Sequence, residues 1–237
     1  MNQFDASYLA HEYFLARRRI TALLDGITRE VADLPVQTCP AWTVHDLIAH
    51  VAGLAAEIVR GNPPGADSQA WVDAIIEARR TVDLDGLLDE WATVGPVFED
   101  MAAETRRLAV PLSYDTVVHE HDLRHAIGRP GARDSSGVIA AMEVGVWLMS
   151  NDLDRRQFGR VVFRAGGRNW QCGSGEVRLE LDLDSARVSQ TPVWELLRIS
   201  GSRRSLSQAM SLPWRGDLER GLPAMLHMDL PVADIIE

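Results

Sequence analysis

The sequence contains no lysine, because all 24 residues counted as Lys+Arg are arginines. Without lysine the chain cannot form a Schiff base with a carbonyl substrate, and it cannot supply the phosphate-binding lysine of a P-loop. Both of these enzyme classes are therefore excluded. Arginine is left as the fixed cation with which the protein can bind a carboxylate.

Cysteines and long apolar runs are also scarce. Cys39 and Cys172 are too few and too far apart for a disulfide framework, so we expect free thiols in a reducing compartment. No apolar run approaches the roughly 20 residues that a membrane span needs. The first residues, MNQFDASYLAHEYF, carry acidic side chains where a signal peptide is basic and then apolar. We expect a cytoplasmic protein with no membrane partner.

The charge balance is acidic, with a formal net charge of −10 and a pI near 5.2. This balance, with no basic stripe, argues against a nucleic acid or an anionic membrane as partner. Apolar residues make up 46% and charged residues 24% of the 237 residues, as in ordinary globular proteins. We expect a monomer whose partners are small molecules.

Helical spacing of apolar residues dominates the first 155 residues. The pattern predicts long helices with short links, including one over residues 7–31, one that starts at a capping box of Thr43 and Asp46, and one over residues 84–107. Such a run of helices is typical of a helical bundle. We therefore predict a first domain over residues 1–155.

The pattern changes after residue 155. Residues 161–163 and 169–172 read as short strands separated by glycines, and residues 177–183 alternate between apolar and charged side chains, as in a half-buried strand. Helical spacing returns at Pro192. Residues 156–237 are therefore predicted to form a small α+β domain.

The most informative stretch is a predicted helix that ends at Gly128, with Pro130 just beyond it. At about 100° per residue, Asp115, His119 and Asp122 fall on one stripe in the middle of its apolar face. A carboxylate or imidazole that faces a core must be paired, hydrogen-bonded or bound to a metal. The stripe is therefore a candidate site, whereas His121 and His125 point away and are expected at the surface or at an interface.

His50 is the candidate third member of this site, because it lies at the edge of the apolar stripe of the helix after Thr43. Two imidazoles and a carboxylate suit a divalent ion such as zinc, iron, nickel or manganese, and they leave open coordination positions. The alternative is that His50 packs at a bundle end, while Asp115 and His119 hydrogen-bond to each other.

Four further residues are weaker candidates. Asp122 could accept a hydrogen bond from His119 and fix its ring, or it could pair with an arginine. Arg203 and Arg204 could bind a carboxylate from the second domain, or they could lie in a solvated turn. Cys39 lacks a predicted activating neighbour, so we interpret it as a buried thiol.

Three segments resemble a known family. Residues 39–50 (CPAWTVHDLIAH), residues 118–134 (VHEHDLRHAIGRPGARD) and residues 202–208 (SRRSLSQ), the last followed by 213–217 (PWRGD), resemble in order the motifs of the mycothiol-dependent maleylpyruvate isomerase family. This family lies within the wider DinB/YfiT-like metalloprotein superfamily.

The resemblance implies a DinB-like four-helix bundle followed by a small α+β domain. It also implies a divalent metal, zinc by preference, held by His50, Asp115 and His119, and mycothiol as thiol cosubstrate. Asp115 stands where the family often has glutamate. An arginine of the C-terminal domain acts in related enzymes, and Arg203 is the matching candidate, although Ser202 replaces the usual glycine before it.

Two functional hypotheses follow. In the first, the protein is a metal-dependent enzyme that uses mycothiol to isomerise or S-conjugate a small electrophile, with Arg203 or Arg204 binding a carboxylate and Asp122 supporting His119. In the second, it is a non-catalytic metal-binding or regulatory module. Incubation of the zinc-loaded protein with mycothiol and a panel of electrophiles would separate the two, and elemental analysis with a thiol-binding titration would identify the metal and the thiol.

Overall fold

The computed structural model describes residues 5–27, 29–186, 189–226 and 228–237. The chain forms two compact units, the first ending at Gly131 and the second beginning at Ala132. We call these the N-terminal unit and the C-terminal unit. In the described part of the chain, no helix combines the length and apolarity that a membrane crossing requires.

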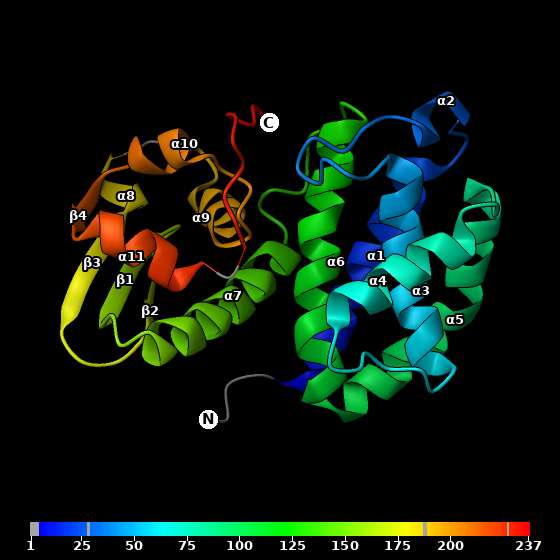
Figure 1. The fold of residues 1–237 in the computed structure, drawn as a ribbon, viewed down its shortest axis with the longest axis horizontal. Coiled ribbons are helices and arrows are strands. Elements are labelled where there is room, and N and C mark those ends of the chain that lie inside the picture. Colours follow the sequence, from blue (N-terminus) through cyan, green and yellow to red (C-terminus); the bar gives the residue numbers. More distant parts are fainter. Residues whose placement is uncertain (1–4, 28, 187–188, 227) are drawn as a thin grey trace. The chain divides into compact units, whose positions relative to one another are not determined.

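The N-terminal unit is helical (Figure 1). Its elements are α1 (Ala6–Leu24), α2 (Arg29–Ala32), α3 (Val44–Val59), α4 (Ser68–Arg79), α5 (Leu84–Glu104) and α6 (Arg106–Ala126). The long helices α1, α3, α5 and α6 pack against one another, and α4 packs on α3. This is the four-helix bundle that the sequence predicts.

Aromatic packing joins α1 and α5 inside this bundle. Tyr13 and Phe98 lie with their ring centroids 4.8 Å apart. The indole nitrogen of Trp91 donates a hydrogen bond of 2.8 Å to the hydroxyl of Tyr13, so both polar groups are satisfied in the core. Burial of Tyr13 raises the pKa of its hydroxyl far above the ordinary value of 10.0, because its effect outweighs that of the hydrogen bond from Trp91.

A buried carboxylate fixes α6 against α1. Glu120 is fully buried, and its oxygens accept hydrogen bonds from Arg19 of α1 at 2.7–2.9 Å and from Arg124 of α6 at 3.0 Å. A buried charge with two guanidinium partners resists rotation of its helix, because any rotation would leave the carboxylate unpaired. The contact thus sets which face of α6 points inward.

The C-terminal unit combines helices with a mixed sheet (Figure 1). Its elements are α7 (Ser136–Arg155), β1 (Arg160–Ala165), β2 (Arg168–Cys172), β3 (Val177–Asp182), α8 (Leu183–Ala186), α9 (Pro192–Ser200), α10 (Leu206–Met210), β4 (Trp214–Gly216) and α11 (Leu218–Met225). The strand order is β2-β1-β3-β4, with β1 and β3 parallel and the other two pairs antiparallel. The predicted α+β architecture is confirmed.

Helix α7 belongs to the C-terminal unit, where it packs on α9, β2 and α11. The division therefore falls at residue 131, before this helix, whereas the sequence analysis places the boundary at 155, after it. Helical spacing identifies α7 as a helix, but it carries no information about which neighbours cover its apolar face.

Candidate metal centre

The start of α3 determines where His50 points. Thr43 and Asp46 form the predicted capping box, in which the Asp46 carboxylate accepts from the Thr43 backbone at 2.9 Å and the Thr43 hydroxyl accepts from the Asp46 backbone at 3.2 Å. The helix that follows buries almost all of its residues, including His50. The imidazole therefore faces the interior of the bundle.

The stripe predicted on α6 also faces inward. Asp122 is fully buried, the side chain of His119 is 7% exposed and that of Asp115 is 29% exposed. Asp115 and His119 are one helical turn apart, the spacing at which two side chains meet on one face. The partly exposed carboxylate opens the cluster to solvent on one side.

The structure brings His50, Asp115 and His119 together. Nε2 of His50 lies 3.2 Å from Oδ2 of Asp115, and Nε2 of His119 lies 3.4 Å from Oδ1 of the same carboxylate. One donor atom from each residue lies within 4.8 Å of the other two. The two ring centroids are 5.0 Å apart, with the rings nearly perpendicular at 79°.

These distances fit a divalent ion. Two ligands that each lie about 2.0–2.2 Å from a tetrahedral zinc ion are about 3.3–3.6 Å apart. Within the described residues, Nδ1 of His50 and Oδ2 of Asp115 are buried and have no hydrogen-bond partner. Nε2 of His50 lies 3.2 Å from this oxygen but not in hydrogen-bonding geometry, and a cation placed between the oxygen and the two Nε2 atoms would satisfy it.

The electrostatics of the cluster also favour a cation. Burial raises the pKa of the Asp115 carboxyl, but the charges of His50 and His119 outweigh burial and hold that pKa well below its usual range. Burial lowers the pKa of the His119 imidazole, but the charge of Asp115 and hydrogen bonds with Asp115, Asp122 and Cys39 raise that pKa well above its usual value. The carboxylate is therefore ionised, and a proton on the His119 imidazole competes with any metal.

A second layer of side chains surrounds His119. Nδ1 of His119 lies 2.9 Å from Oδ2 of Asp122, so this carboxylate can accept the Nδ1 proton and leave Nε2 free for a metal. Cys39 donates from its thiol to the same Asp122 oxygen at 3.8 Å. Cys39 is half-buried, so the expectation of a buried thiol without a notable neighbour is wrong.

Trp42 also reaches the cluster. Its ring centroid is 4.8 Å from that of His50 and 5.6 Å from that of His119. The feature of the sequence that could have assigned Trp42 and Cys39 to the site is their position in the loop just before the capping box of α3. Helical periodicity does not report on a loop, so neither residue was assigned to the site.

His121 does not lie at the surface as expected, because it is buried with 3% of its area exposed. Most of α6 from Thr116 to Leu123 is buried, so the residues that flank the stripe are covered as well. His125 is half-buried, and its Nε2 lies 2.9 Å from Oε1 of Gln37.

Arg203 and Arg204 lie in the C-terminal unit, in the link between α9 and α10. Residues 202–205 are all buried, so the alternative of a solvated turn is wrong. Arg204 binds both carboxylate oxygens of Glu195, at 2.6 and 2.9 Å, and also pairs with Glu237. Its guanidinium is therefore already neutralised, and Nη1 of the buried Arg203 donates to the backbone carbonyl of Gly201 at 2.5 Å.

Comparison with known proteins finds one matching family model and two structures of similar fold. Residues 13–124, which include all three candidate ligands, match the family model for the mycothiol maleylpyruvate isomerase N-terminal domain. No curated protein matches the chain. Two crystal structures are similar in fold at 14% sequence identity, covering 84% of this chain and 90% of theirs.

One of these structures is the mycothiol-dependent maleylpyruvate isomerase, with a TM-score of 0.53, and the other is a histidine-to-alanine mutant of that enzyme, with a TM-score of 0.54. At this identity the two structures establish the fold, and the family match covers residues 13–124, slightly less than half of the 237 residues. The helical N-terminal unit is therefore similar to the mycothiol maleylpyruvate isomerase N-terminal domain, and the chain as a whole is similar in fold to the mycothiol-dependent maleylpyruvate isomerase.

Proposed function

We propose that this protein is a metal-dependent enzyme that uses mycothiol to isomerise or S-conjugate a small electrophile. The observation that carries the proposal is the cluster of His50, Asp115 and His119, whose donor atoms lie within 4.8 Å of one another in a unit that matches the model of this family. A divalent ion, zinc by preference, would be held by these three side chains. When bound, it would lower the pKa of a thiol at its open position, so that the thiolate forms at neutral pH.

The chain's own residues would prepare this chemistry. Asp122 accepts the Nδ1 proton of His119 and fixes its tautomer, and the pairing of Glu120 with Arg19 and Arg124 fixes the rotation of α6. The partly exposed Asp115 lies on the side from which a thiol can approach. Arg203 is the candidate for binding the carboxylate of an acidic electrophile.

Two reactions follow from a thiolate at this position. In isomerisation, the thiolate forms a C–S bond to an activated double bond, the former double bond rotates, and C–S cleavage restores the alkene with inverted geometry and releases the thiol. In S-conjugation, the C–S bond forms as a leaving group departs with its electron pair. A carboxylate substrate needs a local arginine, because the net charge of −10 repels it.

The test begins with removal of the proposed ligands. We expect His50→Ala and His119→Ala each to lose most of the bound metal, measured by elemental analysis after dialysis against a limiting zinc buffer. His11→Ala is the matched control, because His11 is an exposed histidine of the same bundle. Full metal content in both ligand variants would refute the ligand set.

Activity is tested separately on the zinc-loaded protein. It is incubated with mycothiol and with maleylpyruvate or a panel of other electrophiles, and isomers and thioether adducts are separated by chromatography and identified by mass. We expect at least one product whose formation stops when the metal is removed. Stoichiometric metal with no product from any electrophile would instead favour the non-catalytic metal-binding module.

A further inference from the structure

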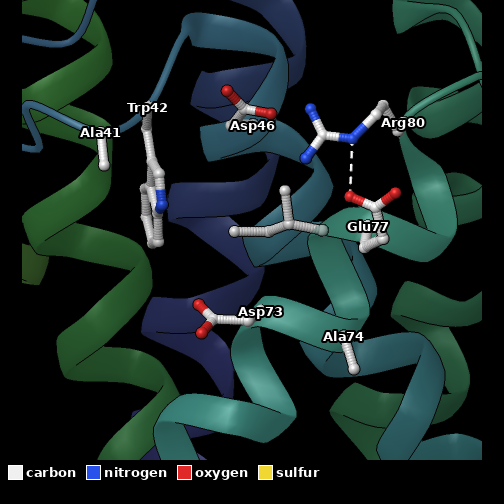
Figure 2. Close-up of a pocket in the computed structure, with 8 residues that line it drawn as sticks. Ala41, Trp42, Asp46, Asp73, Ala74, Glu77 and Arg80 are labelled. Atoms are coloured by element: carbon white, nitrogen blue, oxygen red, sulfur yellow. Dashed lines mark hydrogen bonds and ion pairs between the residues drawn. The ribbon is translucent and has the colours of Figure 1, made fainter.

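A pocket of about 540 Å³ opens on the N-terminal unit, between the loop before α3 and one face of α4 (Figure 2). This volume lies within the range of about 300–1,000 Å³ that is usual for small-molecule sites. Its walls include Trp42, Asp46, Asp73, Ile76, Glu77 and Arg80. None of these residues is among the three proposed metal ligands.

The charged groups of this pocket limit what it can bind. Asp46, Asp73 and Glu77 supply three carboxylates, whereas Arg80 supplies one guanidinium that pairs with Glu77 at 2.6 Å. An anionic ligand would be repelled by this excess of negative charge. Carboxylates accept hydrogen bonds and a guanidinium donates them, so the group matches a ligand rich in hydroxyls, each of which can do both.

Part of this hydrogen-bonding capacity is already used in the fold. Oδ2 of Asp46 accepts from the backbone and the hydroxyl of Thr43, and Oδ1 of Asp73 accepts from Gln69 at 2.8 Å. Oδ1 of Asp46 lies 3.9 Å from Nδ1 of His45, beyond hydrogen-bonding distance, so this oxygen and Oδ2 of Asp73 are the ones that a ligand would meet. These hydrogen bonds also hold both carboxylates in place, which reduces the entropy that a ligand must overcome on binding.

Trp42 provides the flat apolar wall of the pocket. In Figure 2 it stands on one side, facing Asp46 and Asp73, with Glu77 and Arg80 on the opposite side. An indole beside carboxylates suits a ligand ring with C–H groups on its faces and hydroxyls around its edge. The indole would pack against the C–H groups, and the carboxylates would accept hydrogen bonds from the hydroxyls.

The pocket adjoins the metal centre. The Trp42 ring that lines it also lies 4.8 Å from the ring of His50 and 5.6 Å from that of His119. Asp46 precedes His50 by one turn of α3, so their side chains lie on the same face of the helix. A ligand body in the pocket would therefore lie next to the proposed ligands.

We propose that this pocket binds the polyhydroxylated body of the thiol cosubstrate. Mycothiol is a cysteine thiol carried on a glucosamine–inositol pseudodisaccharide, a neutral ring system with many hydroxyls. The inference rests on the proposed function for the identity of the ligand, and on Trp42, Asp46, Asp73, Glu77 and Arg80 for its chemistry. The pocket would hold the sugar-like part while the thiol end reaches the metal centre.

The direct test is binding of N-acetylglucosaminylinositol, which lacks the thiol and keeps the sugar nitrogen as an uncharged amide, by isothermal titration calorimetry on the whole chain. We expect measurable binding that weakens about 10–100-fold in Asp73→Ala and in Glu77→Ala, as for loss of a hydrogen bond to a charged group. Asp89→Ala is the matched control, because Asp89 is an exposed aspartate of α5 outside the pocket. No binding to the unaltered protein would overturn the proposal, as would equal affinity in all four proteins.

Two further measurements complete the test. In the thiol-dependent reaction, the KM for mycothiol should rise in the Asp73 and Glu77 variants by more than kcat falls, with metal content unchanged. Tighter binding of an alkylammonium ion than of N-acetylglucosaminylinositol would reassign the pocket to cations and refute the proposal. Because the sugar titration needs no turnover, an inactive protein that binds the sugar contradicts only the proposed function, and an active protein that does not bind it contradicts only the pocket.

Discussion

Nδ1 of His119 and Oδ2 of Asp122 lie 2.9 Å apart, on consecutive turns of α6. A buried carboxylate at this distance keeps the ring proton on Nδ1, so the lone pair of Nε2 points toward His50 and Asp115. The hydrogen bond therefore controls the proposed metal site through a residue that does not itself need to touch the ion.

Replacing Asp122 with asparagine should weaken metal binding. The amide can donate to Nδ1 and so favour the tautomer with a proton on Nε2, which blocks coordination. We expect about a 10–100-fold lower zinc affinity, measured by competition with a chromophoric chelator. Asp100→Asn, on the exposed face of α5, should leave the affinity unchanged. An Asp122→Asn protein with unaltered affinity would disprove the orienting role.

Loss of the buried carboxylate of Glu120 should destabilise the bundle. Glu120→Gln leaves Arg19 and Arg124 without their counter-charge at a fully buried position. We expect the free energy of unfolding to fall by about 3 kcal/mol, the lower end for a broken buried pair, because Arg19 remains partly exposed. Urea denaturation followed by circular dichroism measures the change.

The control for this variant is Glu77→Gln, which breaks the exposed pair with Arg80 on α4. Exposed ion pairs are screened by water and salt, so this change should leave the urea midpoint nearly unaltered. Equal changes in the free energy of unfolding for the two substitutions would show that burial does not make the ion pairs of Glu120 more stabilising than an exposed pair.

The pH dependence of stability should reflect a network around Arg79. Burial raises the pKa values of Glu57 and Glu90, but hydrogen bonds outweigh burial and hold both pKa values below the ordinary 4.5. The main donors are Asn62 and Arg79 to Glu57, and Arg79 and Arg60 to Glu90. The unfolded state therefore binds protons first as the pH falls. The contribution to stability is present above pH 4.5 and is lost as the pH falls through the lowered values.

The direction of this change in stability with pH can be measured by urea denaturation at a series of acidic pH values. The double variant Glu57→Gln/Glu90→Gln should lose less stability on acidification than the unaltered protein, because its side chains at these positions no longer titrate. An equal or steeper loss in the double variant would contradict the assigned direction of the shifts.

The two thiols should react at different rates. Burial raises the pKa of the Cys172 thiol to about 12, and the residue is fully buried, whereas Cys39 is half-buried in the loop before α3. An aromatic disulfide reagent should therefore label one thiol in the folded protein and a second only after unfolding. In Cys39→Ser the labelling of the folded protein should disappear. Labelling that persists before unfolding would contradict the assignment of the reactive thiol to Cys39.

Much of the fold and of the candidate site could be predicted from the sequence, because both depend on local periodicity. The capping box at Thr43 fixes the phase of α3 and turns His50 inward, and the spacing of Asp115, His119 and Asp122 puts them on one face of α6. Each of these predictions needs only residues within a few turns of one helix.

What could not be predicted depends on contacts between distant segments. Cys39 lies in a loop, and its contact with Asp122 exists only because α3 and α6 are neighbours in the bundle. The burial of His121 and the place of α7 in the C-terminal unit have the same origin. The parallel pairing of β1 with β3 also depends on tertiary structure, since β2 lies between them in the chain but at the edge of the sheet.

The two helices that carry His50 and Asp115 are separated along the chain by α4 and α5. An ion held between them would tie together parts of the polypeptide that meet only after folding, so its binding free energy would add to the stability of the native state. The supply of such an ion would then also affect the lifetime of the protein. A chain without the ion would unfold more often and would be degraded faster by proteases.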